Sequence, residues 1–100
     1  MKLTDGTVAD LLAAFRSPDP TPGGGSASAL AGAVGASLLA MVSALSKPKA
    51  VEDDDVLRLQ VAGNRCRVLA EQLTALIDRD SEAYETVVAA YRLPKATDDE

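Results

Sequence analysis

The sequence contains no histidine, no tryptophan and only one cysteine, Cys66. A single cysteine excludes an intrachain disulfide, and without histidine it also excludes a zinc site of the Cys/His type. Any side chain that acts as a general acid or base must therefore be Asp, Glu, Lys, Tyr or Cys. Cys66 itself lies between two arginines, and we interpret it as a small core residue rather than a reactive thiol.

Aromatic residues and basic runs are also scarce. Only three residues are aromatic although 47% are hydrophobic, so a core must be built from Ala, Leu and Val, which favours closely packed helices. The net charge is −5 and no basic run occurs, so we expect no nucleic-acid partner. The N-terminus lacks the pattern of a signal peptide, which predicts a cytoplasmic protein.

Residues 22–45 contain no charged side chain. Ala dominates and strand-forming residues are few, so the composition predicts an α-helix near residues 25–46. Small and large side chains both recur at three- and four-residue spacing. The small ones are Ala29, Ala33, Ala36, Ala40 and Ala44, and the large ones are Leu30, Val34, Leu38, Met41 and Leu45. A helix that is apolar on every side is a buried helix.

The same stretch is long enough to cross a membrane, because residues 27–45 are all uncharged. They are mostly Ala, Ser and Gly, however, with no aromatic belt and with an acidic rather than a basic flank. Such a helix gains little free energy from lipid. We therefore expect a helix at the centre of a soluble bundle, and no membrane partner.

Three glycines, Gly23, Gly24 and Gly25, lead directly into this helix and are followed by Ser26. A glycine loop at a helix N-terminus exposes backbone N–H groups at the positive end of the helix dipole, where anions bind. Ser26 is suited to be the N-cap or a first-turn hydroxyl. The P-loop pattern is absent, because no Gly-Lys-Ser/Thr follows. The alternative is a flexible connector in front of a buried helix.

Two further helices flank the apolar one. A short helix is predicted at 6–16, capped by Thr4 or Asp5, and the proline-rich segment 17–22 ends it. A long apolar stripe predicts a helix at 53–92. The two long helices expose more apolar surface than this chain can cover. We therefore predict an all-α helical bundle in which the long helix packs on the buried Ala/Gly-rich helix, completed by further chain or a second subunit.

One carboxylate, Asp80, falls within the apolar stripe of the long helix. Leu73, Asp80 and Val87 are seven residues apart, so a continuous helix places them on one face, whereas Asp78 falls elsewhere and can be solvated. A buried carboxylate is costly unless it is paired, so such positions are candidates for function. The alternative is a break or kink near 78–81, with Asp80 capping the second piece. The pattern favours neither.

Three stretches carry a recognisable combination of motifs. They are LTDGTVADLLAAF (3–15), PTPGGGSASALAGAVGASLLAMVSAL (20–45) and DRDSEAYETVVAAYRLPK (78–95). In this order they resemble the cyclodeaminase/cyclohydrolase family. That family comprises the C-terminal domain of formiminotransferase-cyclodeaminase and the stand-alone methenyltetrahydrofolate cyclohydrolases of bacteria. The combination of PTPGGGS, D-x-x-A-Y and RLPK is specific, and the similarity spans nearly the whole chain.

The resemblance implies an all-helical, dimeric folate enzyme with its pocket at or near the subunit interface, and with no metal or redox cofactor. Members act on a one-carbon unit that bridges N5 and N10 of tetrahydrofolate. The cyclodeaminase closes 5-formiminotetrahydrofolate to 5,10-methenyltetrahydrofolate with loss of ammonia, and the cyclohydrolase adds water to the methenyl bridge. We expect the cyclodeaminase reaction, with the cyclohydrolase reaction as the alternative.

The motifs also imply roles for individual residues. Asp80 corresponds to the aspartate of the family's D-x-x-A-F/Y, which can protonate departing ammonia or take a proton from attacking water. Lys95 ends the LPK motif and is either a ligand of the glutamate tail of folate or a solvated loop residue. The implied substrate-binding residues are Gly23, Gly24, Gly25, Ser26 and Lys95.

The family's domains are considerably longer than this chain. We therefore interpret residues 1–100 as a single domain that is the N-terminal half of a longer one. Two functional classes remain. The glycine loop with Asp80 indicates a folate one-carbon enzyme, whereas the Ala/Gly packing helix is equally typical of a non-catalytic helical assembly module or a truncated remnant.

Overall fold

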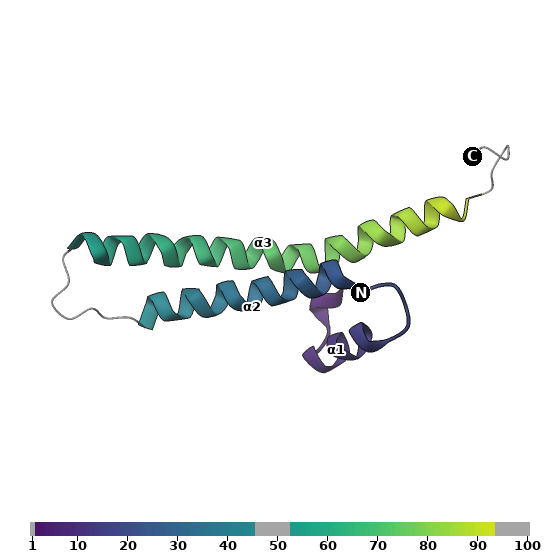
Figure 1. Cartoon of the computed structure of the whole chain (residues 1–100), viewed down its shortest axis with the longest axis horizontal. Helices are drawn as coiled ribbons and strands as arrows, with labels where there is room; N and C mark the ends of the chain where they lie inside the picture. The colour runs from purple at the N-terminus through teal and green to yellow at the C-terminus, as the bar shows by residue number, and fades with distance from the viewer. Residues whose placement is uncertain (1, 46–52, 94–100) are drawn as a thin grey trace.

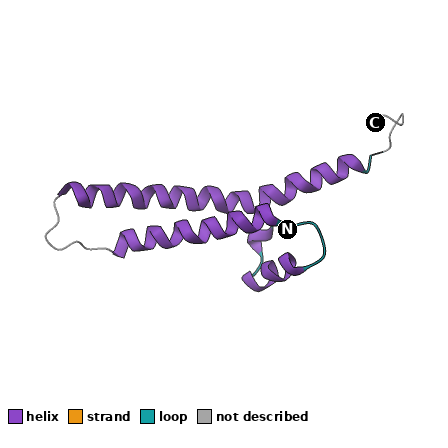
Figure 2. Ribbon diagram, in the orientation of Figure 1, coloured by secondary structure: helices purple, strands orange, loops and turns teal. Residues whose placement is uncertain are grey.

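The computed structural model describes residues 2–45 and 53–93. Four helical elements follow one another: a 3₁₀ turn, η1 (Leu3–Asp5), then α1 (Val8–Arg16), α2 (Gly24–Leu45) and α3 (Asp53–Tyr91). Figure 1 shows α2 and α3 side by side, with η1 and α1 beside the N-terminal end of α2. Helices and loops account for all of the described ranges, and no strand occurs in them (Figure 2). The all-α prediction is confirmed.

The two long helices agree closely with their predicted bounds. α2 begins at Gly24, one residue before the predicted start, and α3 ends at Tyr91, one residue before the predicted end. The predicted end of α2 at residue 46 lies outside the described residues. α3 is continuous through residues 78–81, so a break with Asp80 as a cap is wrong. Figure 1 shows α3 bending where it passes the N-terminal end of α2.

The short helix begins later than predicted. Leu3–Asp5 forms the separate turn η1, and α1 starts only at Val8. Its N-cap is Thr7, whose Oγ1 accepts a hydrogen bond of 3.0 Å from the N–H of Asp10. The predicted caps Thr4 and Asp5 are therefore wrong, because a closer hydroxyl satisfies the first turn.

α2 packs on α3 through one line of small side chains. The buried residues of α2 are Ser26, Ala29, Ala33, Ala36 and Ala40. Their alternating three- and four-residue spacing is typical of helices that cross at a shallow angle. The backbones come close as a result. A Cβ on Gly63 of α3 would overlap the Ser43 hydroxyl, and a Cβ on Gly32 of α2 would lie 3.1 Å from the Leu73 side chain.

Two serines of α2 bind the backbone of α3, one near each end of this contact. Ser26 Oγ donates to the carbonyl of Ile77 at 2.6 Å, and Ser43 Oγ donates to the carbonyl of Leu59 at 2.8 Å. The partners follow in reverse order along the chain, so the two helices are antiparallel. Each such bond contributes a net stabilisation of about 0.5–1.5 kcal/mol.

The other faces of the long helices carry large apolar side chains that stay exposed among the described residues. On α2 and α3 these include Val34, Leu38, Leu39, Met41, Leu45, Leu57, Val61, Val68, Leu69, Leu76, Tyr84, Val87 and Tyr91. Within the described residues α2 is thus buried along one side. This exposure agrees with the prediction that the two long helices carry more apolar surface than this chain can cover. By length and composition α2 also qualifies as a membrane span, a test that core helices of soluble bundles pass as well.

The packing of α2 on α3 can be tested with Ala33→Leu. Ala33 is 7% exposed, so a larger side chain forces the helices apart, and we expect the free energy of unfolding to fall by about 1–3 kcal/mol. Ala31→Leu is the matched control, because Ala31 is exposed on the same helix. Urea unfolding followed by circular dichroism measures both. Equal losses for the two variants would contradict the packing described here.

Candidate functional site

The glycine loop and Asp80 meet at the N-terminal end of α2. The Cα of Gly25 lies directly against the Asp80 side chain, and a Cβ at position 25 would overlap the carboxyl carbon and both oxygens of Asp80. A Cβ on Gly24 would meet nothing within 4 Å. The contact with Asp80 therefore requires glycine at position 25, because any side chain there would overlap the carboxylate, whereas position 24 does not require glycine.

The start of α2 adds an electrostatic component. The N–H of Ala27 donates to the carbonyl of Gly23 at 3.0 Å, which begins the hydrogen-bonded ladder of the helix. The N–H groups before Ala27 have no acceptor within the helix and lie at the positive end of its dipole. The Asp80 carboxylate lies beside this end, where the dipole attracts negative charge.

An open pocket of about 530 Å³ adjoins the contact between Gly25 and Asp80. It is lined by Gly25, Ser28, Ala29, Leu73, Leu76, Arg79, Asp80 and Ala83. Leucine and alanine side chains supply apolar walls, Ser28 supplies a hydroxyl, and Arg79 and Asp80 supply one charge of each sign. Apolar walls with a few convergent polar groups are typical of small-molecule sites. Asp80 is exposed here, so a ligand in the pocket can reach its carboxylate.

Ser26 does not line this pocket. It is fully buried, with 0% of its surface exposed. Its hydroxyl donates to the Ile77 carbonyl at 2.6 Å and is 3.0 Å from Ser81 Oγ. The Ser26 hydroxyl is thus used between the two helices and holds the glycine loop on α3, and substrate binding by Ser26 stays a prediction.

The buried carboxylate of α3 is Asp78, not Asp80. Asp78 is 8% exposed and accepts hydrogen bonds from the N–H of Leu3 at 2.5 Å and from Thr4 Oγ1 at 2.7 Å. It thereby fastens η1 to α3. Asp78, which the sequence pattern allowed to be solvated, is therefore buried, and Asp80, for which burial was one of two alternatives, is exposed.

Both differences have a physical cause in how α3 is covered. Leu73 and Asp80 do face α2, at Gly32 and Gly25, but they lie at the edge of a contact whose buried centre is Ile77 and Ser81. Asp78 is covered from another side, by η1. Periodicity finds which residues share a face, not which face receives a partner. The sequence held a signal for Ser81, because it follows the apolar Ile77 by four residues and residues four apart are neighbours on one helix face.

The remaining predicted residues lie apart from this contact. A Cβ on Gly23 would lie 3.0 Å from the carbonyl oxygen of Pro20, so Gly23 packs against the proline-rich segment. Gly24 lies in the first turn of α2. Lys95 lies outside the described residues. Of the predicted site residues, the structure thus brings Gly25 and Asp80 into contact.

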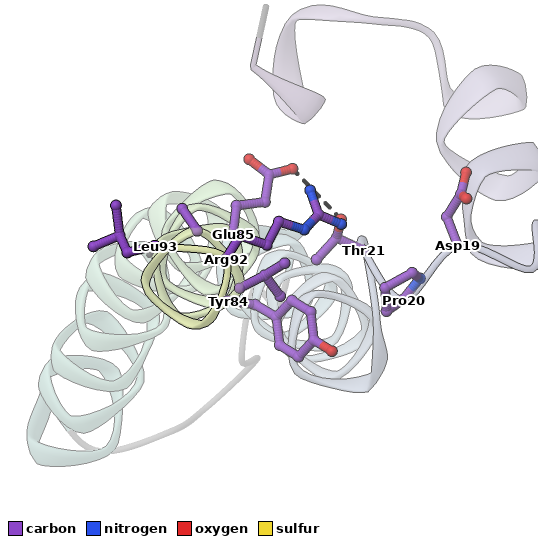
Figure 3. A pocket seen from close by; sticks show the side chains of 9 residues that line it. Asp19, Pro20, Thr21, Tyr84, Glu85, Arg92 and Leu93 are labelled. Carbon is purple, nitrogen blue, oxygen red and sulfur yellow. Dashed lines mark hydrogen bonds between the residues drawn. The ribbon is translucent and has the colours of Figure 1, made fainter. Parts of the chain in front are cut away.

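A second pocket, of about 730 Å³, lies between the proline-rich segment and the C-terminal half of α3 (Figure 3). Thr21 Oγ1 donates to Glu85 Oε1 across it at 3.4 Å. Tyr84, one helical turn beyond Asp80, forms part of its lining. Within residues 2–45 and 53–93, no three His, Cys, Asp or Glu side chains are grouped so that they could hold a metal ion.

The regions of this chain that are similar to known proteins include the glycine loop and Asp80. The family model of formiminotransferase-cyclodeaminase matches residues 7–100. The chain belongs to the formiminotransferase-cyclodeaminase family. The match includes both the glycine loop and Asp80. The family predicted from the motifs is confirmed.

Members of the formiminotransferase-cyclodeaminase family differ in their sequence identity to this chain. The methenyltetrahydrofolate cyclohydrolase of Methylorubrum extorquens is 44% identical over 96 residues, which cover 94% of this chain and 45% of that protein. The formimidoyltransferase-cyclodeaminases of Gallus gallus and Rattus norvegicus are each 35% identical over 81 residues, which cover 79% of this chain and 15% of each protein. The chain thus spans less than half the length of these relatives.

The contact between Gly25 and Asp80 can be tested with Gly25→Ala. The added methyl group would overlap the carboxylate, so we expect the Asp80 side chain to move by about 1 Å or more. Gly24→Ala is the matched control in the same helical turn, because a methyl group there meets open space. Crystal structures of both variants measure the displacement. An Asp80 carboxylate that stays in place in Gly25→Ala would contradict the contact.

Proposed function

We propose that the pocket beside Gly25 and Asp80 acts on the one-carbon unit of a tetrahydrofolate derivative. The observation that carries this proposal is the position of the Asp80 carboxylate, which is exposed to the pocket and held against the Gly25 Cα. A methenyl group bridging two nitrogens forms a cationic amidinium, and a carboxylate beside it attracts that charge. The names of the family relatives support a folate substrate.

The cyclohydrolase reaction is the first candidate, because the cyclohydrolase relative is more similar and covers more of this chain than the cyclodeaminases. Water attacks the bridging carbon, a C–O bond forms, and Asp80 takes one proton from the water. The bond from this carbon to one nitrogen then breaks, and that nitrogen receives the proton from Asp80. The remaining hydroxyl proton passes to solvent as the carbonyl forms.

The cyclodeaminase reaction is the second candidate, favoured by the similarity to the avian and rodent bifunctional enzymes. Here N10 attacks the carbon of the protonated formimino group, a C–N bond forms, and Asp80 takes the proton that N10 loses. The bond from this carbon to the exocyclic nitrogen then breaks, and Asp80 returns the proton to that nitrogen, which leaves as ammonia and yields the cationic methenyl product. Both reactions need only addition, elimination and proton transfer, so the proposal includes no metal or redox cofactor. Assays of the full-length protein with each substrate separate the two candidates.

The pocket residues take distinct roles in this proposal. Gly25 leaves room for the Asp80 carboxylate at the pocket. Arg79 places a cation at the edge of the pocket, where it can attract an anionic part of the folate. Gly23, Gly24 and Lys95 stay predictions, with Lys95 expected to bind the glutamate tail. A non-catalytic assembly module would show no binding of a reduced folate even at millimolar concentration.

The catalytic role of Asp80 can be tested with Asp80→Asn in the full-length protein. Asparagine keeps the shape of the side chain but cannot transfer the proton, so we expect turnover to fall by about 10²- to 10⁴-fold while folate still binds. Steady-state kinetics and isothermal titration with a reduced folate measure the two effects.

Glu82→Gln is the control for this substitution, since Glu82 is an exposed carboxylate in the same part of α3 and the charge change is identical. We expect its turnover to stay within about two-fold of the wild type. Near-normal turnover in Asp80→Asn would end the catalytic assignment.

We also propose that the exposed apolar faces of α2 and α3 are covered in the assembled protein, by further chain or by a second subunit. Large contiguous apolar surfaces on a folded chain mark interaction sites. We expect the full-length protein to sediment as a dimer or a higher oligomer in analytical ultracentrifugation. A single well-folded monomeric species would contradict a second subunit.

A further inference from the structure

The contact between Gly25 and Asp80 is followed in both helices by a hydrogen-bonded pair. Ser26 comes directly after Gly25, and Ser81 comes directly after Asp80. The two hydroxyl oxygens are 3.0 Å apart and buried, with Ser26 at 0% and Ser81 at 7% exposure. Gly25 and Asp80, which are in contact at the pocket, are therefore each bonded along the chain to a serine, and these two serines form a buried hydrogen bond with each other.

The direction of these hydrogen bonds follows from the groups involved. A carbonyl oxygen only accepts, so the hydroxyl proton of Ser26 is used on Ile77. Ser81 must then be the donor to Ser26. The same Ile77 carbonyl also accepts the backbone N–H of Ser81 within α3. The three residues thus form one closed set of hydrogen bonds between the start of α2 and one turn of α3.

We infer that Ser26 and Ser81 are positioning residues that hold Asp80 in its reactive place. This inference rests on the proposed function of Asp80. The Asp80 side chain is exposed and takes its position from the wall formed by the Gly25 Cα. That wall stays in place only if the start of α2 stays fixed on α3, and the Ser26 hydroxyl fixes it there. Neither serine needs to touch the substrate.

The molecule offers a matched comparison within the same pair of helices. Ser43 of α2 donates to the Leu59 carbonyl of α3 at 2.8 Å, which is the same kind of bond as that from Ser26 to Ile77. Ser43 lies near the C-terminal end of α2, whereas Asp80 lies against Gly25 at the N-terminal end of that helix. If these serines only stabilise the helix pair, replacing either one should change stability and kcat to the same extent. If Ser26 positions Asp80, replacing Ser26 should lower kcat and replacing Ser43 should not.

The test compares Ser26→Ala with Ser43→Ala in the full-length protein, with 5,10-methenyltetrahydrofolate as substrate. We expect both variants to lower the urea midpoint by comparable amounts. We expect kcat to fall by about 10- to 100-fold in Ser26→Ala, because small displacements of a reacting group are costly, with little change in KM. We expect kcat of Ser43→Ala to stay within about two-fold of the wild type.

Ser81→Ala keeps the inference testable if Ser26→Ala does not fold. It leaves the bond from Ser26 to Ile77 intact, and we expect kcat to fall by several-fold, again with little change in KM. Equal effects of Ser26→Ala and Ser43→Ala on kcat would overturn the positioning role while leaving the proposed function intact. Full turnover in Asp80→Asn would instead overturn the proposed function, and with it this inference.

Discussion

The close approach of α2 to α3 is the constraint on which the rest of the structure depends. It exists because the facing residues of α2 are alanines and serines, while Gly32 and Gly63 leave room for the side chains of Leu73 and Ser43 on the opposite helix. Larger residues would separate the helices. At this short separation a serine hydroxyl can reach the carbonyl of the opposite helix, and the Cα of Gly25 can lie against the Asp80 carboxylate.

The same constraint explains why the site lies at the end of the helix pair. Past the start of α2, no other helix of residues 2–45 and 53–93 accompanies α3, and the proline-rich segment forms a pocket with α3 instead. The start of α2 therefore combines a helix dipole, a glycine surface and an exposed carboxylate in one place. Because small side chains bury little apolar area, individual hydrogen bonds such as that of Ser26 are a large part of what holds this end together.

The features that sequence reasoning recovered are those with a local cause. The extents of α2 and α3 follow from composition and periodicity, and the pairing of the glycine loop with Asp80 follows from motif similarity. The features that sequence reasoning missed depend on which face of α3 packs against another part of the chain. Asp78 and Asp80 are two residues apart, so a choice of face exchanges the buried carboxylate for the exposed one. The cap of α1 was missed because Thr4 and Thr7 both precede the helix and only the fold distinguishes them.

A crystal structure of the full-length protein with a bound reduced folate tests the central claim most directly. The account predicts that the N5 and N10 edge of the folate lies in the pocket beside Gly25, with the bridging carbon within reach of the Asp80 carboxylate directly or through one water. It also predicts that Ser26 stays buried against Ile77 and Ser81. A folate bound elsewhere, with Asp80 away from its one-carbon unit, would contradict the account.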